Sequence, residues 1–208
     1  MNLIKKILNF IKYNLKDKWG FIYLEKSLDD SIFNIPNTDE SLVVRVAEKK
    51  DIEKITADIF PYLTEEERTS EGRYINRIGD DDFTCFIAEK DGSVVHFFLV
   101  YENALNSPLT KTPFNKSIIQ DAEAYLGKTF TIPEARGLWI VPISLSIILL
   151  YLRDTVKAKK AYVLVHKDTP GADDFYKKLG FNVIKNACNN RFFDFYYLIK
   201  NNTGRNKC

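Results

Sequence analysis

The sequence predicts an α/β (α+β) fold, with a mixed central sheet of about six to seven strands, flanking helices and an N-terminal amphipathic helix. Short runs of β-branched and aromatic residues, bounded by turn residues, alternate with longer segments whose apolar residues recur at helical spacing. Apolar residues make up 45% and charged residues 28% of the 208 residues, which is typical of a folded globular chain.

The N-terminal segment predicts a basic amphipathic helix. Its apolar face carries Ile4, Ile7, Leu8, Ile11 and Leu15. We expect this helix to pack on its own domain or on a partner in a homodimer, and the alternative is a contact with a membrane surface. Lysines interrupt the apolar run, so we do not expect a signal peptide.

The chain is expected to hold one domain, in residues 42–200. Residues 1–41 would form the N-terminal helix and an extension, and residues 201–208 a polar tail. Within the extension, Trp19 to Leu28 fits no element clearly, and the stretch from Asp29 to Ser41 is typical of a loop.

The first half of the domain reads as βααββ. The expected elements are strands at Leu42 to Val46, Phe83 to Ala88 and Val94 to Tyr101, and helices at Glu48 to Ile59 and from Thr64 to Ile78. Thr64 and Glu67 have the spacing of a capping box, which places a helix start at Thr64. Asp91 and Gly92 tolerate positive φ and predict a hairpin turn.

The second half reads as strand, helix, strand, helix, strand, strand. The expected elements are Ala122 to Ile132, Val141 to Leu152, Ala161 to His166, Thr169 to Gly180, Asn182 to Cys188 and Arg191 to Ile199. The apolar run around the first helix has about fifteen residues, fewer than the roughly twenty that span a membrane, so we expect a buried helix. Thr169 is expected to cap the second helix, with Pro170 in its first position.

Charge and cysteine usage exclude several partners. The net charge is +2 and no long run of like charges occurs, so nucleic acid is not indicated. Cys85, Cys188 and Cys208 lie far apart and form neither a CxxC pair nor a metal-ligand set. The chain is therefore expected to be cytoplasmic and to need no metal.

Two segments resemble the motifs of the GNAT superfamily of acyl-CoA-dependent N-acyltransferases. The segment TIPEARGLWIVPISLSIILLYL resembles the acyl-CoA motif, in which a strand runs into an Arg-Gly-x-Gly-type loop that opens a helix. The segment TPGADDFYKKLGF resembles the second signature, a helix that ends in Tyr-x-x-x-Gly-Phe. The resemblance covers roughly residues 42 to 199. It implies acetyl-CoA or a related acyl-CoA as co-substrate and an amine as acceptor.

The loop of the first motif has a physical basis of its own. A helix N-terminus offers unpaired N–H groups and partial positive charge to a pyrophosphate. Arg136 would add a charge-assisted contact, and Gly137 would let the backbone come close. The sequence departs from the family pattern at Trp139, where a second Gly is usual, and at Val141, where Gly or Ala is usual. These larger side chains would narrow the site.

The resemblance implies a cofactor site formed by the strand end, the loop and the helix start, together with the start of the second signature. The expected members are Phe130, Thr131, Ile132, Arg136, Gly137, Leu138, Trp139, Ile140, Val141 and Thr169. The alternative is a strand-to-helix turn that binds nothing.

By resemblance, Tyr176 would stabilise the departing thiolate. A phenol has a pKa of about 10 and a thiol about 8.5, so we expect a hydrogen bond rather than full proton transfer. An ammonium with a pKa of about 10.4 also needs a general base. Glu123 is the candidate for this base, so that Tyr176 and Glu123 are the two expected catalytic residues, and Glu134 is the alternative base. His96 and His166 lie in expected strands, where satisfied structural histidines are usual.

The function expected from the resemblance is an N-acetyltransferase that moves an acetyl or other acyl group to an amine by direct attack in a ternary complex. The acceptor would be a small molecule or a peptide, in a pocket lined by the loop from Asn103 to Lys116 and the helix from Thr64 to Ile78. One alternative is a CoA-binding or regulatory module without turnover. Another is a relative that transfers aminoacyl groups from tRNA, which the near-neutral charge disfavours.

Overall fold

The computed structural model describes residues 18–29, 32, 39–80, 82–111, 119–190 and 195–199. The predicted N-terminal helix and the polar tail lie outside these described residues. The chain divides into a larger unit, residues 27–107 and 120–161, and a smaller unit, whose described parts lie in 18–26, 108–119 and 162–199.

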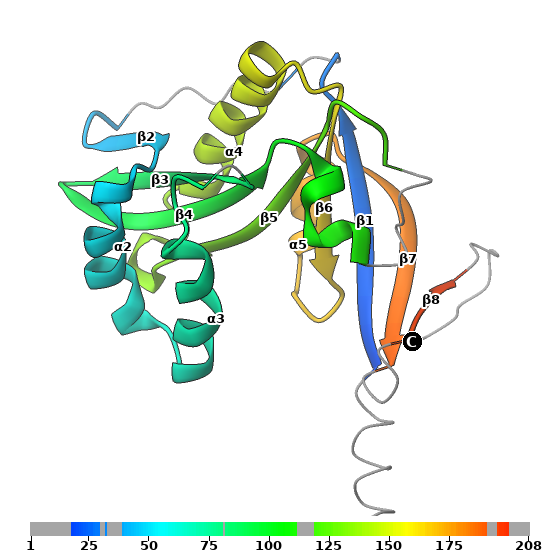
Figure 1. Cartoon of the computed structure of the whole chain (residues 1–208), viewed down its shortest axis with the longest axis horizontal. Helices are drawn as coiled ribbons and strands as arrows, with labels where there is room; N and C mark the ends of the chain where they lie inside the picture. The colour runs from blue at the N-terminus through cyan, green and yellow to red at the C-terminus, as the bar shows by residue number, and fades with distance from the viewer. Residues whose placement is uncertain are drawn as a thin grey trace, which may run out of the picture. The chain divides into compact units, whose positions relative to one another are not determined.

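The larger unit contains an antiparallel sheet in the order β2-β3-β4-β5. Its strands are β2 Leu42–Val46, β3 Thr84–Lys90, β4 Ser93–Tyr101 and β5 Glu123–Thr131. Its helical segments are η1 Lys49–Asp51, α2 Ile52–Ile59, η2 Phe60–Tyr62, α3 Glu65–Ile75, η3 Ala104–Asn106, η5 Pro133–Ala135, α4 Ile140–Tyr151 and the π-helical η6 Leu152–Val156. Helices α2 and α3 cover one face of this sheet and α4 covers the other (Figure 1).

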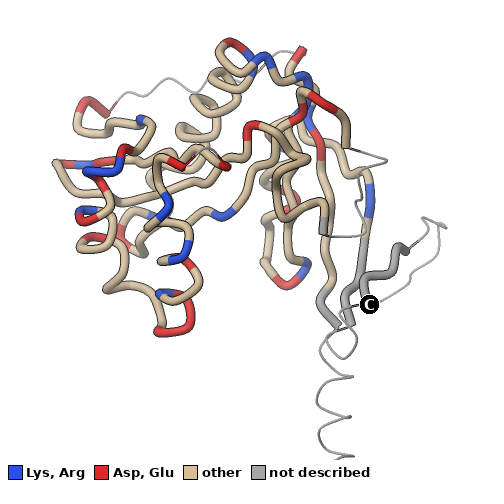
Figure 2. The backbone as a smooth tube through the Cα atoms, in the orientation of Figure 1, with Lys and Arg blue, Asp and Glu red and all other residues tan. Residues whose placement is uncertain are grey.

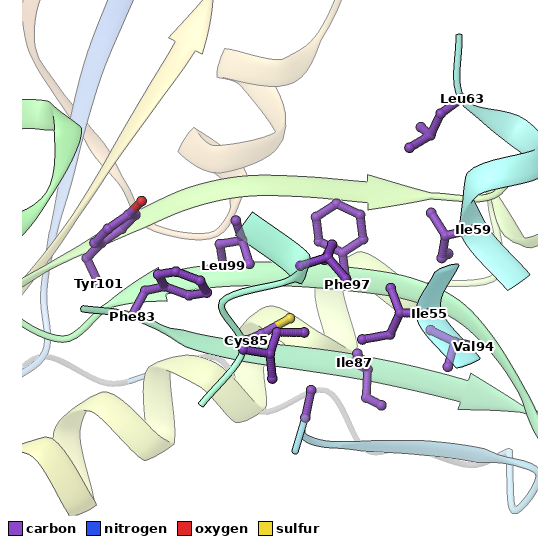
Figure 3. Packing of buried hydrophobic residues seen from close by; sticks show 13 residues of the cluster. Ile55, Ile59, Leu63, Phe83, Cys85, Ile87, Val94, Phe97, Leu99 and Tyr101 are labelled. Carbon is purple, nitrogen blue, oxygen red and sulfur yellow. The ribbon is translucent and has the colours of Figure 1, made fainter. Parts of the chain in front are cut away.

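Both faces of this sheet are buried by apolar side chains. On the α2 and α3 side, Ile55 and Ile59 pack with Phe97 and other residues of β3 and β4 (Figure 3). On the other side, Ile140 and Ile143 of α4 belong to a second cluster with β2, β3 and β4 residues. This two-sided burial confirms the prediction that the apolar run is a buried helix. Within the described residues, no helix has the length and apolar character needed to cross a membrane.

Two local predictions in this unit are confirmed. Thr64 is the N-cap of α3, its Oγ1 accepts a hydrogen bond from the Glu67 N–H at 3.3 Å, and Glu67 Oε2 accepts from the Thr64 N–H at 2.8 Å. The hairpin between β3 and β4 turns through Asp91 and Gly92, with φ of 50° and 82°. Both α2 and α3 carry acidic as well as basic residues, and three of the acidic ones lie together in the first turn of α3 (Figure 2).

The smaller unit holds strands in the order β6-β1-β7-β8. They are β1 Lys18–Ser27, β6 Lys160–His166, β7 Asn182–Asn190 and β8 Phe195–Ile199, with helices η4 Pro108–Lys111 and α5 Ala172–Lys178. Strand β1 pairs antiparallel with β7, from Lys18 opposite Asn190 to Glu25 opposite Asn182. The segment around Trp19 to Leu28, which fitted no element in the sequence, is thus mainly a strand with a neighbour on each side.

The start of α5 differs from the prediction. The helix begins at Ala172 with Gly171 as its N-cap, so Thr169 does not cap it. Thr169 instead forms a turn, in which its N–H donates to His166 O at 3.0 Å and its C=O accepts from Ala172 N–H at 3.3 Å. Gly171 adopts φ of 73°, a left-handed conformation that glycine enters without steric cost, so the helix starts after it. The predicted end is confirmed, since Gly180 has φ of 83°.

Candidate functional site

The loop between β5 and α4 lies at the carboxyl end of β5. The N–H of Ile132 donates to Val95 O at 3.0 Å, and the N–H of Ala135 donates to Ile132 O at 3.1 Å, which turns the chain out of the sheet. Helix α4 has 12 residues and begins directly after the loop. The predicted strand–loop–helix arrangement is therefore present, with unpaired N–H groups expected at the helix start.

Gly137 exposes the backbone of this loop. Its φ of 84° lies in the left-handed region, and a Cβ placed on it would meet no atom within 4 Å. The backbone angle alone therefore favours glycine here, because the surrounding space would accept a side chain. The open space beside the main chain is what a phosphate group needs to approach it closely.

Trp139 is the N-cap of α4 and has a backbone conformation that favours glycine over tryptophan. Its φ of 60° and ψ of 10° are left-handed, and its side chain is 66% exposed. A non-glycine residue in this region costs roughly 1–2 kcal/mol. The motif that this loop resembles has Gly here, and glycine enters this region without steric cost. The α4 start is nonetheless intact, because the Ile143 N–H donates to Trp139 O at 3.0 Å.

The first turn of α4 offers fewer donors than most helix starts. Pro142 is the third helical residue and has no N–H. Of the first three helical residues, only Ile140 and Val141 therefore have an N–H group, and neither group has an acceptor within the helix. Val141 is half-buried, so its larger side chain does not stand free over the loop.

Arg136 is tied to the end of β5. Its Nε donates to Thr131 O at 3.2 Å, and its guanidinium carbon lies 5.9 Å from the centroid of the Phe130 ring. Thr131 Oγ1 in turn lies 2.8 Å from Nδ1 of His96 on β4. Arg136, Phe130 and Thr131, which were predicted separately, therefore form one connected group at the loop.

His96 is buried beneath this connection. Burial lowers the pKa of its imidazole to about 4, so the ring is neutral at physiological pH. Nε2 has no hydrogen-bond partner among the described residues. The interpretation of His96 as a satisfied structural histidine thus holds for one ring nitrogen and not for the other.

Strand β5 contains a bulge that the sequence analysis missed. Phe98 lies opposite Thr129 and Val100 lies opposite Leu126, so two residues of β5 face one residue of β4. The two residues are Gly127 and Lys128. A bulge leaves a residue outside the ladder, and bulges are common next to active sites. Gly127, a lone glycine inside a strand pattern, is the signal that could have revealed it.

Close packing explains the glycine in this bulge, and Lys128 links the bulge to α3. A Cβ on Gly127 would come within 3.1 Å of Leu99 O and of the Tyr101 ring. Lys128 Nζ donates to Ser70 Oγ and Glu71 Oε1, each at 2.7 Å. The bulge is therefore packed closely against β4 at Gly127 and hydrogen-bonded to α3 through Lys128.

A pocket of about 520 Å³ opens in the larger unit. It is lined by the end of β2, by residues 79–80 and 82–85, and by residues after β4 that include Asn103 and Asn106. The loop from Asn103 was predicted to line the acceptor pocket. The α3 helix itself contributes no lining residue, and the segment that follows it does.

The pocket lining is acidic. It contains Asp80, Asp82 and Glu102 and, among the described residues, no Lys or Arg. Arg77 pairs with both aspartates, with its Nε 3.1 Å from Asp80 Oδ2. Glu102 has no such pair among the described residues.

Two hydroxyl groups orient the Glu102 carboxylate. Its Oε1 accepts from Thr84 Oγ1 at 2.5 Å and from Tyr151 Oη at 2.6 Å. Its Oε2 has no hydrogen-bond partner in the described part of the chain. Burial and the adjacent Glu102 raise the pKa of Tyr151 to about 12, so the phenol stays a hydrogen-bond donor. The pocket thus presents an oriented carboxylate that lacks a positive partner.

Cys85 also lines this pocket, where burial disfavours the reactive thiolate form of its side chain. Its side chain is buried, and burial raises the pKa of the thiol to about 12. A thiol, not a thiolate, is therefore present at neutral pH, and catalytic cysteines react as thiolates. Chemistry through a covalent cysteine intermediate is disfavoured at this position.

The predicted catalytic residues lie away from the loop or in the other unit. Glu123 is buried at the start of β5, and its Oε2 accepts from the Gln120 N–H at 2.6 Å. At about 3.3 Å per residue, it lies roughly 26 Å along the strand from Thr131. Tyr176 belongs to the smaller unit, where its ring packs against Phe175 and Phe181 at centroid distances of 5.2 and 5.3 Å.

Burial sets the protonation state of Tyr176. Its side chain is buried, and burial raises the pKa of the phenol well above its usual range. Thr169, in the same unit, is exposed in its turn. Neither observation tests the role that the resemblance implies for these residues.

Comparison with solved structures identifies the fold. The chain is similar to a GCN5-related N-acetyltransferase from Kribbella flavida, with a TM-score of 0.51 and 13% identity over 89% of this chain and 62% of that one. It is also similar to the GCN5-related glucosamine N-acetyltransferase region of a fungal multi-domain GH3 β-N-acetylglucosaminidase. That match has a TM-score of 0.62 and 14% identity over 88% of this chain and 22% of that one.

A third similar structure carries a CoA derivative. AAC(6')-Iy in complex with the bisubstrate analogue CoA-S-monomethyl-acetylneamine matches with a TM-score of 0.50 and 14% identity, over 68% of this chain and 90% of that one. No family model and no curated protein sequence matches the chain. The chain spans less than two thirds of the Kribbella flavida protein and has the fold of the GNAT superfamily.

Proposed function

We propose that the chain is an N-acyltransferase that moves an acetyl or other acyl group from acyl-CoA to an amine by direct attack in a ternary complex. The observation that carries the proposal is the loop after β5 in a GNAT fold. There Gly137 has φ of 84° and open space at its Cβ position, directly before the α4 start. Acyl-CoA supplies an activated thioester, whose C–S bond breaks as the C–N bond forms.

The loop fits the pyrophosphate of the proposed co-substrate. The free N–H groups of Ile140 and Val141 would donate to it, and Gly137 would let the main chain approach. Arg136 would place its guanidinium nearby, held by Thr131 O. Phe130, Ile132, Leu138, Trp139 and Thr169 complete the proposed set from the resemblance.

The bulge supports a path for the rest of the co-substrate along β5. Lys128 lies about 13 Å along the strand from Ile132, at roughly 3.3 Å per residue. An extended pantetheine arm is of this order in length. The backbone that the bulge displaces from the ladder is available to hydrogen-bond such an arm or its thioester carbonyl.

The acidic pocket supports an amine as acceptor. The unpaired Glu102 carboxylate would attract an ammonium group, and such charge-assisted contacts are stronger than neutral ones. Asn103 and Asn106 offer further polar groups for a hydroxylated or peptide amine. We therefore place the charged part of the acceptor in this pocket.

The residues that we propose for the hydrogen bond to the thiolate and for deprotonation of the amine come from the resemblance to the GNAT motifs. We propose that Tyr176 donates a hydrogen bond to the departing thiolate, for which its raised pKa keeps it protonated. The amine must lose a proton, and Glu123 is the proposed base, although its Oε2 already accepts from Gln120. Glu123→Gln should lower kcat while acetyl-CoA binding is kept if Glu123 has this role.

The alternative is a CoA-binding or regulatory module without turnover. Trp139 in place of glycine and Pro142 in the first turn both favour it, because they reduce space and donors at the loop. Release of free thiol from acetyl-CoA across a panel of amines tests the choice. Thiol release that depends on an amine supports the enzyme, and saturable binding without release with every amine supports the module.

We also propose that the chain works in the cytoplasm. The unpaired, buried Cys85 suits a reducing compartment. Fractionation of cells that express the chain would test this location.

A further inference from the structure

Trp139 carries a large aromatic ring that the folded chain does not use. Among the residues whose exposure the structure describes, it is the most exposed large apolar residue, at 66%, and its backbone is left-handed. In the described part of the chain, its indole makes no hydrogen bond and no ring contact. Neither burial nor backbone preference favours a tryptophan here, and strained residues of this kind concentrate at functional sites.

The position of Trp139 indicates what the ring could bind. It lies two residues after Gly137, and the N–H groups proposed to hold a phosphate follow directly in Ile140 and Val141. A ring beside a phosphate site suits a ligand in which a planar base is linked to phosphate. Purine nucleotides have this chemistry, and aromatic side chains stack on bases.

We propose that Trp139 is the stacking platform for the adenine ring of acyl-CoA, and that it makes the site selective for CoA thioesters over thioesters of phosphopantetheine. This inference rests on the proposed function of the loop. The phosphate contacts alone would bind either thioester, because both contain a phosphate. Stacking acts only on the one with adenine.

Affinity for two thioesters tests the inference. The ligands are acetyl-CoA and S-acetyl-4'-phosphopantetheine, measured by calorimetry on the wild-type chain and on Trp139→Ala, Trp139→Gly and Trp139→Phe. We expect the Ala and Gly variants to bind acetyl-CoA about 5- to 100-fold more weakly, as for loss of one stacked base. Their affinity for the phosphopantetheine thioester should not change, and the Phe variant should stay close to wild type.

Fluorescence gives a second and direct readout. The chain has two tryptophans, so Trp19→Phe leaves Trp139 as the single tryptophan, whose emission is read with excitation on the long-wavelength side of tyrosine absorption. Acetyl-CoA and adenosine 3',5'-bisphosphate should quench this emission, and S-acetyl-4'-phosphopantetheine should not. Equal quenching by all three would overturn the assignment of adenine to the indole.

The Gly and Ala variants also separate stacking from a structural role. Glycine relieves the left-handed strain, so Trp139→Gly should fold at least as stably as Trp139→Ala and still lose adenine binding. Equal weakening of both thioesters would overturn the inference while leaving the acyl-CoA proposal intact. Failure of the folded wild-type chain to bind acetyl-CoA would overturn both.

Discussion

The imidazole Nδ1 of His96 lies 2.8 Å from the hydroxyl oxygen of Thr131. The contact joins β4 to the last residue of β5, from which the Arg136 loop departs. Because His96 is fully buried, its pKa is lowered from 6.5 to about 4. The base of the proposed cofactor loop therefore depends on a histidine that must stay neutral.

This burial predicts a loss of stability in mild acid. In the unfolded chain His96 binds a proton with a pKa near 6.5, and in the folded chain only with a pKa near 4. The contribution of neutral His96 to the free energy of unfolding is therefore fully present above pH 6.5 and is lost as the pH falls towards 4. It amounts to about 2 kcal/mol or more by pH 4.5. Urea unfolding at pH 7 and pH 4.5 should show a smaller loss for His96→Gln than for the wild type. Equal losses would show that His96 does not titrate in this way.

Backbone strain at Trp139 predicts an order of stability. Trp139→Gly and Trp139→Ala both remove the indole, but only glycine enters the left-handed region freely. We expect the Gly variant to be more stable than the Ala variant by about 1 kcal/mol in free energy of unfolding. Gly137→Ala should be destabilised by a similar amount, since its Cβ meets no neighbour and only strain remains. An Ala variant at 139 as stable as the Gly variant would argue against the left-handed backbone.

Glu102 is predicted to select a charged acceptor. Glu102→Gln keeps the shape and the hydrogen bonds from Thr84 and Tyr151 but removes the charge. The KM for a cationic amine should rise about tenfold, with kcat little changed, because the charge acts on binding. Glu53→Gln, in an exposed carboxylate at the start of α2, is the matched control and should leave KM unchanged. An equal change in both variants would assign the effect to overall charge.

Tyr176 is predicted to act in turnover and not in folding. Tyr176→Phe keeps the ring that packs against Phe175 and Phe181. We expect kcat to fall about 100- to 1,000-fold, the range for loss of one donor that stabilises charge in the transition state, while the affinity for acetyl-CoA is kept. Tyr62→Phe changes an exposed tyrosine and is the control, for which we expect kcat to stay unchanged. Unchanged kcat in Tyr176→Phe would remove the role that the resemblance implies.

Elements with local signals could be predicted from the sequence. The capping box at Thr64 and the Asp91-Gly92 turn work through neighbouring residues, so their spacing was sufficient. The prediction that Thr169 caps α5 was wrong. Both Thr169 and Gly171 suit a helix start, but the backbone of Thr169 is hydrogen-bonded in a turn that precedes the helix, so the helix starts after Gly171. Strand β1 has little signal of its own, since its pairing with β7 depends on residues distant in the sequence.

The site was partly predictable for the same reason. Arg136 and Gly137 could be identified because the loop, the strand before it and the helix after it are continuous in sequence. The acidic pocket could not, because it brings together Asp82, from before β3, and Glu102, from after β4. The bulge left one sequence signal, Gly127, whose cause is the approach of Leu99 and Tyr101 across the sheet.

Calorimetric titration of the wild-type chain with acetyl-CoA tests whether the loop after β5 binds acyl-CoA. We expect saturable binding and a stabilisation of about 2.7 kcal/mol at a ligand concentration one hundred times Kd. Gly137→Ala should bind at least about tenfold more weakly, because its Cβ would occupy the open space at the loop. A folded wild-type chain that binds neither acetyl-CoA nor any other acyl-CoA would contradict the proposed binding.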